Sequence, residues 1–346
     1  MKAVRSWFTP SNEQVYVLDQ LQPAISPTSA YGLLSNSKLR IIPSIDNDAF
    51  SDVSLLHHPG AERVTGVTCM PPNAAITADV GAIVWSCSEN GIIAAWDVMR
   101  SPGSVASFGE TRRAPFGCIS VGLGGTLIAA GTDEGSESRI MFWDVRRLQE
   151  PLTIFDESHS DSITQLCFSP NGSTSMISGS VDGLVCAFDL SKPSESAALQ
   201  SVMKPNSVCS HIGYFGANYE GIYATTRTET LSIFELESSE TISAYDYDLV
   251  KGTGCRETLQ ELSKMEINYL IDCSWQPRLQ KLILLAGNDE GNGFGFDVDL
   301  EGFKPLDNFA GGHRDVIRCG KIFEIPNKAI GLLTGGEDGR MCVWAI

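Results

Sequence analysis

The 346-residue sequence is poor in basic residues, in aromatic residues and in long apolar runs. Its 25 lysines and arginines stand against 42 aspartates and glutamates, which gives a formal net charge of -17. Because a surface of this charge repels phosphate backbones and anionic headgroups, we expect neither a direct nucleic-acid partner nor a membrane partner. No apolar run approaches the roughly 18 residues of a spanning helix. The opening segment "MKAVRSWFTPSNEQ" also lacks the apolar core of a secretory leader.

The cysteines lack the spacing of a metal site or of a disulfide framework. No two of the ten form a closely spaced pair, and most fall inside apolar runs such as "ITQLCFSP" and "IDCSWQP". This pattern is typical of reduced thiols in a protein core. We therefore expect no bound metal, no cofactor, and a location in the cytoplasm, the nucleus or both. The cysteines are Cys69, Cys87, Cys118, Cys167, Cys186, Cys209, Cys255, Cys273, Cys319 and Cys342.

What the chain does contain is an internal repeat. An apolar strand that closes with an aromatic residue, usually followed by an acid, recurs at intervals of 47, 45, 46, 62 and 48 residues. A weaker first copy, "KLRIIPS", has Ile42 in the place of the aromatic residue, which makes seven units. The aromatic residues are Trp96, Trp143, Phe188, Phe234, Phe296 and Trp344.

Each unit also carries the pattern of four short strands. Upstream of the aromatic residue lies a strand that ends in an Asp-Gly or Asn-Gly turn, as in "TSMISGSVDG" at 174–183, and upstream of that lies another apolar run. Four strands in about 45 residues match one blade of a β-propeller. Because the last unit ends on its third strand, we expect the opening segment 2–8 to supply the fourth strand and close the ring.

The fold predicted by this pattern is all-β, a seven-bladed β-propeller that occupies residues 1–346 as a single domain. The 62-residue interval indicates an insertion at about 245–267, with a helix-compatible stretch at 255–265. Such an insertion is either a lid over the central funnel or a passive, packed excursion.

Two sets of polar residues recur at blade spacing in the order histidine, serine or threonine, and aspartate. Such residues form a buried hydrogen-bond chain that stabilises a blade, and a tryptophan indole completes it. Because the hydroxyls lie on strands and not on a nucleophile elbow, we interpret the sets as structural and expect no enzymatic activity. The sets are His313, Thr334, Asp338 and Trp344, and His159, Ser178 and Asp182, where Phe188 replaces the tryptophan.

With these features the chain resembles the WD40-repeat family over essentially its whole length. The resemblance rests on "ESHSDSITQLCFSP…SGSVDGLVCAFDL" (157–190), "YLIDCSWQP" (269–277), "GGHRDVIR" (311–318) and "LLTGGEDGRMCVW" (332–344). It implies a seven-bladed propeller without known enzymatic activity. The first unit lacks the Trp-Asp signature, and the fifth and sixth units carry phenylalanine in its place.

The propeller architecture predicts that many acids gather on one end of the ring. That end carries the turns between second and third strands and the loops that enter each first strand. An acidic face attracts a basic partner, so we expect a protein-binding scaffold, monomeric, with a basic client of the kind that chaperones or assembly factors bind, such as a ribosomal protein or a histone. The alternative is a solvated surface that only keeps the protein soluble. The predicted face comprises Glu89, Asp133, Glu134, Asp156, Glu157, Asp161, Asp246, Asp248, Asp289, Glu290, Asp315 and Glu337.

Three arginines of the last unit fall near the same end and form a possible clamp for a carboxylate of the partner. Pairing with nearby Asp315 or Glu337 is the competing interpretation. The arginines are Arg314, Arg318 and Arg340.

A different function is suggested by the segment "FWDVR". Its residues Trp143, Asp144 and Arg146 resemble the Trp-Asp-x-Arg box with which WD40 substrate receptors engage the adaptor of cullin ubiquitin ligases. Pairing of Arg146 within its own blade is the alternative. A third class, an enzyme in the axial funnel, is disfavoured because the inner strands offer cysteines without clustered acids or histidines.

Overall fold

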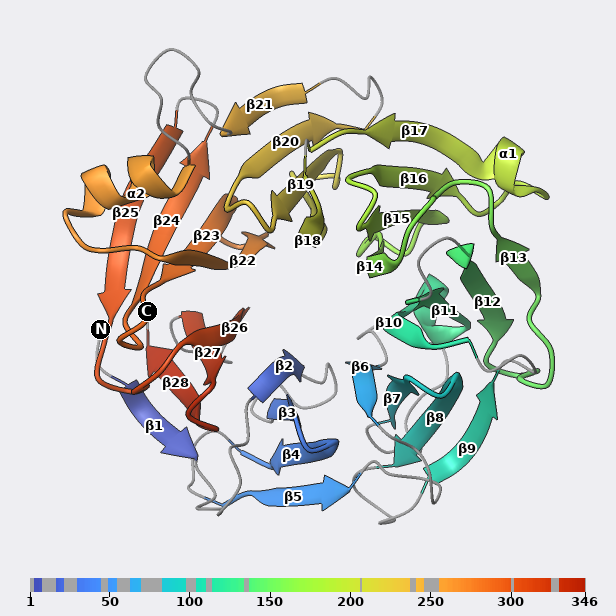
Figure 1. Cartoon of the computed structure of the whole chain (residues 1–346), viewed down its shortest axis with the longest axis horizontal. Coiled ribbons are helices and arrows are strands. Elements are labelled where there is room, and N and C mark those ends of the chain that lie inside the picture. The colour runs from blue at the N-terminus through green and yellow to red at the C-terminus, as the bar shows by residue number, and fades with distance from the viewer. Residues whose placement is uncertain are drawn as a thin grey trace.

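Seven four-stranded antiparallel sheets form a closed ring in the computed structural model (Figure 1). Each sheet is one blade, and the first strands of neighbouring blades contact one another all the way round the ring. The predicted seven-bladed propeller is therefore confirmed. The structure describes residues 3–7, 17–21, 30–44, 49–54, 63–69, 83–97, 104–109, 114–133, 137–205, 207–236, 241–245, 255–299, 302–324 and 330–345.

Each blade places its first strand beside the axis and its fourth strand at the rim. Blade 1 contains, in that order, β2 (Val17–Leu21), β3 (Ala30–Leu34), β4 (Lys38–Ile42) and β5 (Ser51–Ser54). Blade 2 contains β6 (Val64–Cys69), β7 (Ile83–Ser88), β8 (Ile92–Asp97) and β9 (Ser104–Gly109). Blade 3 contains β10 (Phe116–Gly122), β11 (Leu127–Thr132), β12 (Ile140–Asp144) and β13 (Thr153–Phe155). Blade 4 contains β14 (Ile163–Phe168), β15 (Ser175–Ser180), β16 (Val185–Asp189) and β17 (Leu199–Met203).

The remaining blades follow the same order. Blade 5 contains β18 (Cys209–Phe215), β19 (Gly221–Thr226), β20 (Leu231–Glu235) and β21 (Thr241–Tyr245). Blade 6 contains β22 (Tyr269–Gln276), β23 (Lys281–Gly287), β24 (Gly293–Asp299) and β25 (Gly302–Phe309). Blade 7 contains β26 (Ile317–Glu324), β27 (Ile330–Gly336), β28 (Met341–Ala345) and β1 (Ala3–Trp7). A 3₁₀ turn (Leu123–Gly125) and two short helices, α1 (Glu195–Ala198) and α2 (Cys255–Ser263), lie between strands.

The hydrophobic core lies between the blades. Seven clusters of buried side chains are found among the described residues, and each combines residues of two neighbouring blades. The aromatic residues of the repeat contribute to these clusters, as Trp96 does between blades 1 and 2 and Trp344 does between blades 6 and 7. Removal of this apolar surface from water stabilises the ring at every blade interface.

The ring closes through its N-terminal strand, as predicted. β1 pairs antiparallel with β28, from Ala3 opposite Trp344 to Trp7 opposite Met341. Trp7 is only 2% exposed and packs with Leu34 of blade 1. Because β1 comes from one end of the chain and β28 from the other, this pairing completes the four strands of blade 7 and covers the outer edge of β28.

A buried arginine reinforces this closure, and the sequence analysis did not find it. Arg40 on β4 is 2% exposed, and its guanidinium binds both carboxylate oxygens of Asp52 at 2.9 and 3.1 Å. It also donates to the backbone carbonyls of Gly339, at 2.6 Å, and Trp7, at 3.4 Å. One side chain thereby joins blade 1 to two parts of blade 7, the end of β1 and the turn between β27 and β28.

The helical part of the insertion packs against the propeller. α2 contacts β25, and its Leu259 is fully buried in the cluster between blades 5 and 6, together with Ile267. The rest of the insertion, residues 246–254, lies outside the described residues. In the described part of the chain, neither helix has the length or the hydropathy needed to cross a bilayer.

Removal of the Arg40 guanidinium should weaken the closure strongly. Arg40→Ala removes the buried guanidinium that binds the carboxylate of Asp52 and the carbonyl of Gly339, so we expect the free energy of unfolding to fall by about 3 kcal/mol or more. Urea denaturation followed by tryptophan fluorescence measures the change. The control is Arg63→Ala, because Arg63 is 52% exposed and 3.9 Å from Glu89, a pair worth under about 1 kcal/mol. Equal losses in the two variants would contradict the closure role.

Candidate functional site

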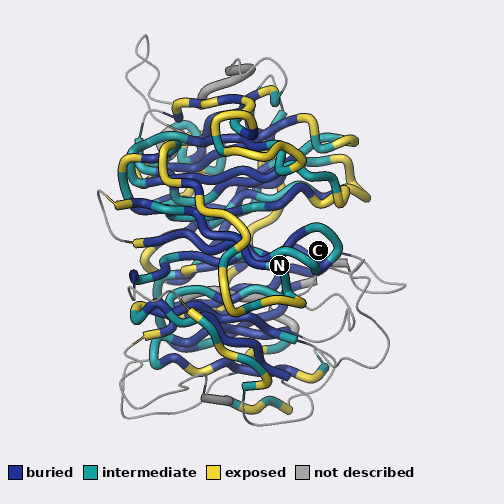
Figure 2. Tube along the Cα trace, turned by 90° about the vertical axis from the view of Figure 1, so that its right-hand side faces the viewer, coloured by how far each residue is buried: buried dark blue, intermediate teal, exposed yellow. Residues whose placement is uncertain are grey.

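The loops of the propeller gather at its two ends. We call the top face the end that carries the connections between second and third strands and the connections that enter each first strand; the other end is the bottom face. Figure 2 shows that the strands are largely buried and that exposed residues lie mainly in connections and on outer strands. A binding surface for another molecule is therefore built from these connections, or from the channel along the axis.

The hydrogen-bond chain of blade 7 is complete. His313 contacts Asp338 through Nδ1 at 3.1 Å and Thr334 through Nε2 at 2.8 Å. The indole of Trp344 donates to Thr334 Oγ1 at 2.7 Å. Thr334 and Trp344 are both fully buried. Because no substrate reaches a hydroxyl with zero exposure, the geometry supports a structural role for this set.

Blade 4 contains the shorter version. His159 contacts Ser178 at 2.7 Å and Asp182 at 3.0 Å, and Ser178 is fully buried. Burial alone would raise the pKa of Asp182, but hydrogen bonds from His159 and from the Ser160 N–H outweigh it and bring the pKa below its ordinary value. The same balance, with His313 as the main donor, lowers the pKa of Asp338.

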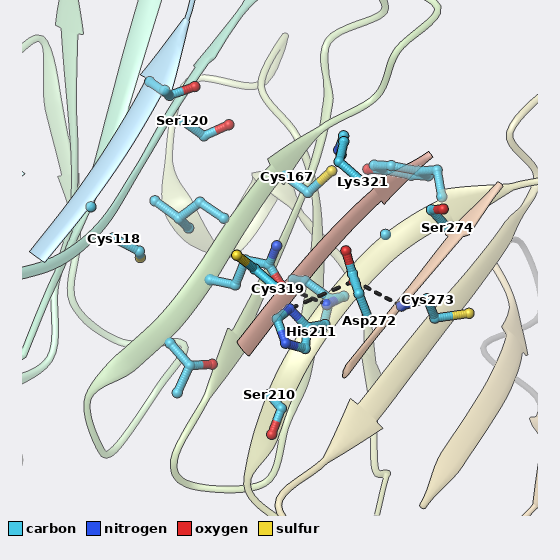
Figure 3. A pocket seen from close by; sticks show the side chains of 18 of the residues that line it. Cys118, Ser120, Cys167, Ser210, His211, Asp272, Cys273, Ser274, Cys319 and Lys321 are labelled. Carbon is cyan, nitrogen blue, oxygen red and sulfur yellow. Dashed lines mark hydrogen bonds and ion pairs between the residues drawn. The ribbon is translucent and has the colours of Figure 1, made fainter. Parts of the chain in front are cut away.

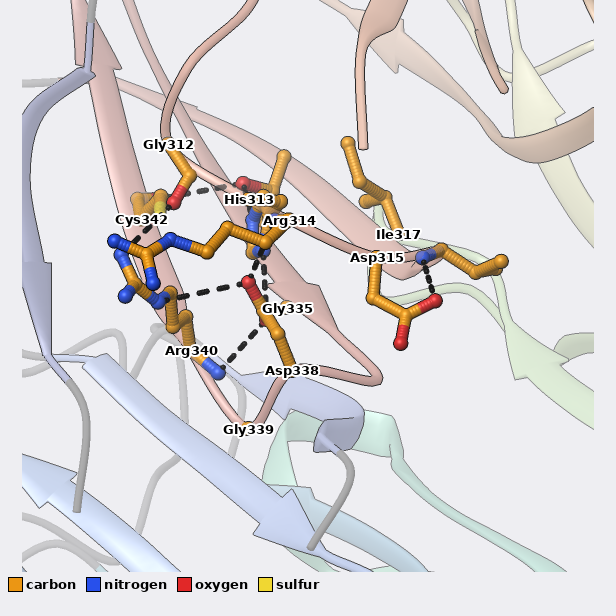
Figure 4. Close-up of polar contacts among 12 residues, drawn as sticks. Gly312, His313, Arg314, Asp315, Ile317, Gly335, Asp338, Gly339, Arg340 and Cys342 are labelled. Atoms are coloured by element: carbon orange, nitrogen blue, oxygen red, sulfur yellow. Dashed lines mark hydrogen bonds and ion pairs between the residues drawn. The ribbon is translucent and has the colours of Figure 1, made fainter. Parts of the chain in front are cut away.

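The three arginines of blade 7 differ in their surroundings, and Figure 4 shows two of them, Arg314 and Arg340. Arg318 forms an ion pair with Glu337. Arg340 lies 3.6 Å from Asp338 and donates to the Gly312 carbonyl at 3.4 Å. Arg314 is exposed, and its backbone N–H donates a hydrogen bond to the Asp338 carboxylate at 2.9 Å. Two of the three predicted clamp residues therefore neutralise acids of their own blade, although the Arg318 side chain remains 56% exposed, and Arg314 is exposed without an ion pair in the described chain.

The predicted acidic residues fall into three groups. Glu89 and Glu337 are paired with arginines, whereas Glu134, Asp246 and Asp248 lie outside the described residues. The others form no ion pair with a cation of the described chain; five are exposed and two are half-buried. This last group comprises Asp133, Asp156, Glu157, Asp289 and Glu290, and the half-buried Asp161 and Asp315.

Blades 3 and 4 bring four of these acids to one part of the top face. Asp156, Glu157 and Asp161 lie on the connection between the blades, and Asp133 follows β11. Gly117 at the start of β10 lies close to both Asp133 and Ile163. A methyl group at this glycine would be 3.2 Å from Asp133 Cβ and 3.2 Å from the Ile163 carbonyl oxygen. Asp133 therefore sits beside the start of β14, next to the connection that carries the other three.

A carboxylate that the sequence analysis missed holds this connection in place. Glu195 of α1 accepts hydrogen bonds from the backbone N–H groups of Asp156, Glu157 and Ser158 at 2.7 to 3.1 Å, and from the Ser158 hydroxyl at 2.5 Å. The backbone is thereby fixed while the side chains of Asp156 and Glu157 remain exposed. No local pattern marks Glu195, because its partners are 37 to 39 residues away.

The Trp-Asp-x-Arg box lies where β12 ends, at the bottom face. Trp143 is buried, and Asp144 accepts two hydrogen bonds from the Arg146 guanidinium at 2.9 and 2.6 Å. These bonds lower the pKa of Asp144 to about 2. The Arg146 side chain remains 73% exposed, so it is paired within its blade and also accessible from solvent.

A channel of about 630 Å³ runs through the centre, lined by residues from β6, β10, β14, β18, β22 and β26. Its wall includes His211, whose Nδ1 is 3.7 Å from Asp272 (Figure 3). The place of His211 in the channel follows only from the geometry of the ring. Among the described residues, no group of histidines, cysteines and acids is arranged to hold a metal ion.

Removal of the central hydroxyl should cost the two hydrogen-bond chains different amounts of stability, because the hydroxyls have different numbers of partners. Thr334→Val removes the partner of two groups, His313 Nε2 and the Trp344 indole N–H. Ser178→Ala removes the partner of one, His159 Nε2. Each histidine keeps its contact with aspartate through Nδ1. We expect losses in the free energy of unfolding of roughly 3 kcal/mol for the first variant and roughly 1 to 2 kcal/mol for the second. Urea denaturation at neutral pH measures both. A larger loss for Ser178→Ala would show that the indole bond is unimportant.

The lowered pKa of Asp338 makes part of the stability depend on pH. A carboxyl whose folded-state pKa is depressed stabilises the protein above its unfolded pKa, and this contribution is lost as the pH falls through the folded-state value. Asp338→Asn should therefore be destabilised at pH 7 and should approach the wild type in urea midpoint as the pH falls below about 4. Asp307→Asn, an exposed change on β25, is the control and should follow the wild type at every pH. A constant deficit for Asp338→Asn would contradict the prediction.

The comparisons with known proteins agree with this geometry. Residues 149–189 match the family "WD domain, G-beta repeat". The chain is 29% identical to "WD repeat-containing protein 89 homolog" of Dictyostelium discoideum, over 75% of this chain and 67% of that protein. It is 30% identical to "WD repeat-containing protein GTS1" of Arabidopsis thaliana, over 76% of this chain and 66% of that protein. The chain thus spans about two thirds of the length of these relatives.

A solved structure, "Crystal Structure of Mitotic Checkpoint Complex", contains a chain of the same fold. The TM-score is 0.73 at 14% sequence identity, over all of this chain and 92% of that one. The repeat, the seven blades and the sequence relatives together show that the chain belongs to the WD40-repeat family of β-propellers.

Proposed function

We propose that this propeller is a non-enzymatic scaffold that binds a basic segment of another protein on its top face, over blades 3 and 4. WD40 propellers generally serve as interaction scaffolds without catalytic activity, which supports the first half of the proposal. The second half depends on one observation: Asp133, Asp156 and Glu157 are exposed and form no ion pair with a cation of the described chain.

The contrast with other acids of the same face supports this choice. Glu89 and Glu337 already have arginine partners, so a ligand would have to displace these to gain a contact. The carboxylates of blades 3 and 4 need no such exchange, and Glu195 fixes the backbone that carries two of them. A pre-organised surface costs less conformational entropy on binding than a flexible one.

The client that fits is a segment rich in lysine or arginine. Electrostatic attraction raises the rate of encounter by about 10- to 1,000-fold at low salt and is screened as salt rises. A scaffold that covers such a segment is suited to an escort or assembly role for basic proteins, of which ribosomal proteins and histones are the abundant examples.

Neutralising the exposed carboxylates should weaken the binding of a basic peptide. For the triple variant Asp133→Asn, Asp156→Asn, Glu157→Gln we expect an affinity loss of about tenfold at low salt, since exposed charge pairs contribute roughly 0.2 to 1 kcal/mol each. Fluorescence anisotropy with a labelled lysine- and arginine-rich peptide measures the affinity. The same peptide with its charges replaced by glutamine gives the background.

The matched control is the triple variant Glu150→Gln, Glu220→Gln, Asp307→Asn. These three acids are exposed, and none lies on the top face. Both variants change the net charge equally, so a non-specific attraction to an acidic protein weakens to the same extent in both. Equal affinity losses would therefore refute the top-face site.

The alternative function, a substrate receptor of a cullin ubiquitin ligase, is favoured by the 73% exposure of Arg146 at the opposite face. Arg146→Ala should abolish co-precipitation of the ligase adaptor if this function holds. It should leave the affinity for the basic peptide unchanged in either case, since the two faces are separate. Adaptor recovery equal to wild type would eliminate this alternative.

A further inference from the structure

The outer strand of blade 3 presents two exposed apolar side chains close to the acids of the top face. Leu152 is 57% exposed and Ile154 is 39% exposed. Ile154 is paired with Met141 of β12, which belongs to the buried cluster between blades 2 and 3. Because paired residues of an antiparallel sheet lie on the same face, Ile154 lies on the face of blade 3 that is turned toward blade 2. Leu152 comes two residues earlier in the extended chain and falls on the same face. We call Leu152 and Ile154 the apolar strip.

The propeller fold does not require an apolar residue at this place. Ile154 lies opposite the residue that comes two positions before the aromatic residue of the repeat, Trp143. The corresponding residue of blade 4 is Val202. In the other five blades it is small or polar, which is the usual choice for a position in contact with water. These five residues are Ser6, Asp52, Ser107, Ala244 and Asn308.

The apolar strip continues directly into the acids of blades 3 and 4. A strand rises by about 3.3 Å per residue, so Asp156 follows Ile154 at a distance of roughly 7 Å. Asp156 and Glu157 are exposed and form no ion pair with a cation of the described chain. The backbone of this segment is held at both ends, because the Leu152 N–H donates to the Phe142 carbonyl and the Asp156 N–H donates to Glu195, each at 2.7 Å. The apolar strip and the two acids therefore form one continuous surface on a fixed backbone.

The edge of the sheet beside this surface is open. β13 is the outermost strand of blade 3, and no strand of the described chain pairs with its outer edge (Figure 1). An extended segment of another protein can lie along such an edge, with its alternate side chains on the exposed residues. β13 is only three residues long, so the side-chain contacts, rather than a long ladder of backbone hydrogen bonds, would determine the affinity.

We propose that the client segment is extended and carries two alternating apolar residues next to its basic residues. The apolar side chains lie on Leu152 and Ile154, and the basic side chains lie at Asp156 and Glu157. This inference rests on the proposed function and adds an apolar half to the recognition. The acids select a basic segment by charge, whereas burial of the apolar strip adds affinity that salt does not screen. A segment with basic residues alone would leave the apolar strip in contact with water.

Two labelled peptides of equal charge test the proposal with the full chain. Both contain the same cluster of lysines and arginines; one continues into two leucines that alternate with serine, and the other has serine in place of the leucines. Each is made with the extension before and after the basic cluster, because the direction of the client chain is not fixed. For one of the two orders we expect the leucine peptide to bind about tenfold more tightly than the serine peptide, at low and at high salt. Fluorescence anisotropy measures the four affinities.

Variants then locate the contact. The double variant Leu152→Ala, Ile154→Ala should remove the advantage of the leucine peptide and leave the affinity for the serine peptide unchanged. The matched control is Leu279→Ala, Leu306→Ala, which truncates two leucines of blade 6 that are 40% and 43% exposed and should alter neither affinity. Thermal melting verifies that each variant is folded.

The acid variant Asp156→Asn, Glu157→Gln separates this inference from the proposed function. It should weaken the binding of both peptides. If it does so while leucine and serine peptides bind equally in both orders, or while the apolar-strip variant retains the full advantage of the leucine peptide, the inference is wrong and the proposed function stands. If the acid variant weakens the binding of neither peptide, the proposed function is wrong as well.

Discussion

The interface between the first and the last blade is the constraint on which the rest of this structure depends. Six of the seven blade interfaces join segments that follow one another in the chain, but this one joins the two ends. The pairing of β1 with β28 inside blade 7 places Trp7 against blade 1, and the buried guanidinium of Arg40 joins the two blades. Arg40 and the Gly339 carbonyl are 299 residues apart in sequence, so the contact forms only when the ring is complete.

A closed ring also explains why the polar networks are structural. The chains that include Thr334 and Ser178 are buried inside single blades, where they fix the turn between second and third strands. Glu195 has a similar role between blades, since it fixes the connection that carries Asp156 and Glu157. The exposed groups available for function are therefore side chains on rigid backbone at the two faces and in the channel.

The fold could be predicted from the sequence because its information is local and repeated. Each unit contains its own strands, the six units after the first contain the aromatic residue, and several contain an Asp-Gly or Asn-Gly turn. The turn glycines Gly183 and Gly339 have the positive φ angles that such turns need. The members of the histidine chains could be found for the same reason, since each set lies within one unit. The incomplete hydrogen-bond chain of blade 4 could also be predicted, because Phe188 stands in the place of the tryptophan and has no N–H to donate.

The site was less accessible to sequence reasoning because its properties depend on distant partners. The pattern placed acids on one face but did not show that Arg318 neutralises Glu337, while Asp133 has no such partner. Arg40 and Glu195 were missed because their hydrogen bonds cross between blades. His211 reaches the channel only through ring geometry, which the residues around it do not reveal.

The central claim is that the exposed carboxylates of blades 3 and 4 receive a basic segment. Zero-length carbodiimide cross-linking of the full chain to a lysine-rich peptide, followed by mass-spectrometric mapping, tests it most directly. The account predicts cross-links concentrated at Asp133, Asp156 and Glu157. Cross-links that fall mainly on the bottom-face acids Glu150 and Glu220, or evenly over all exposed carboxylates, would contradict it.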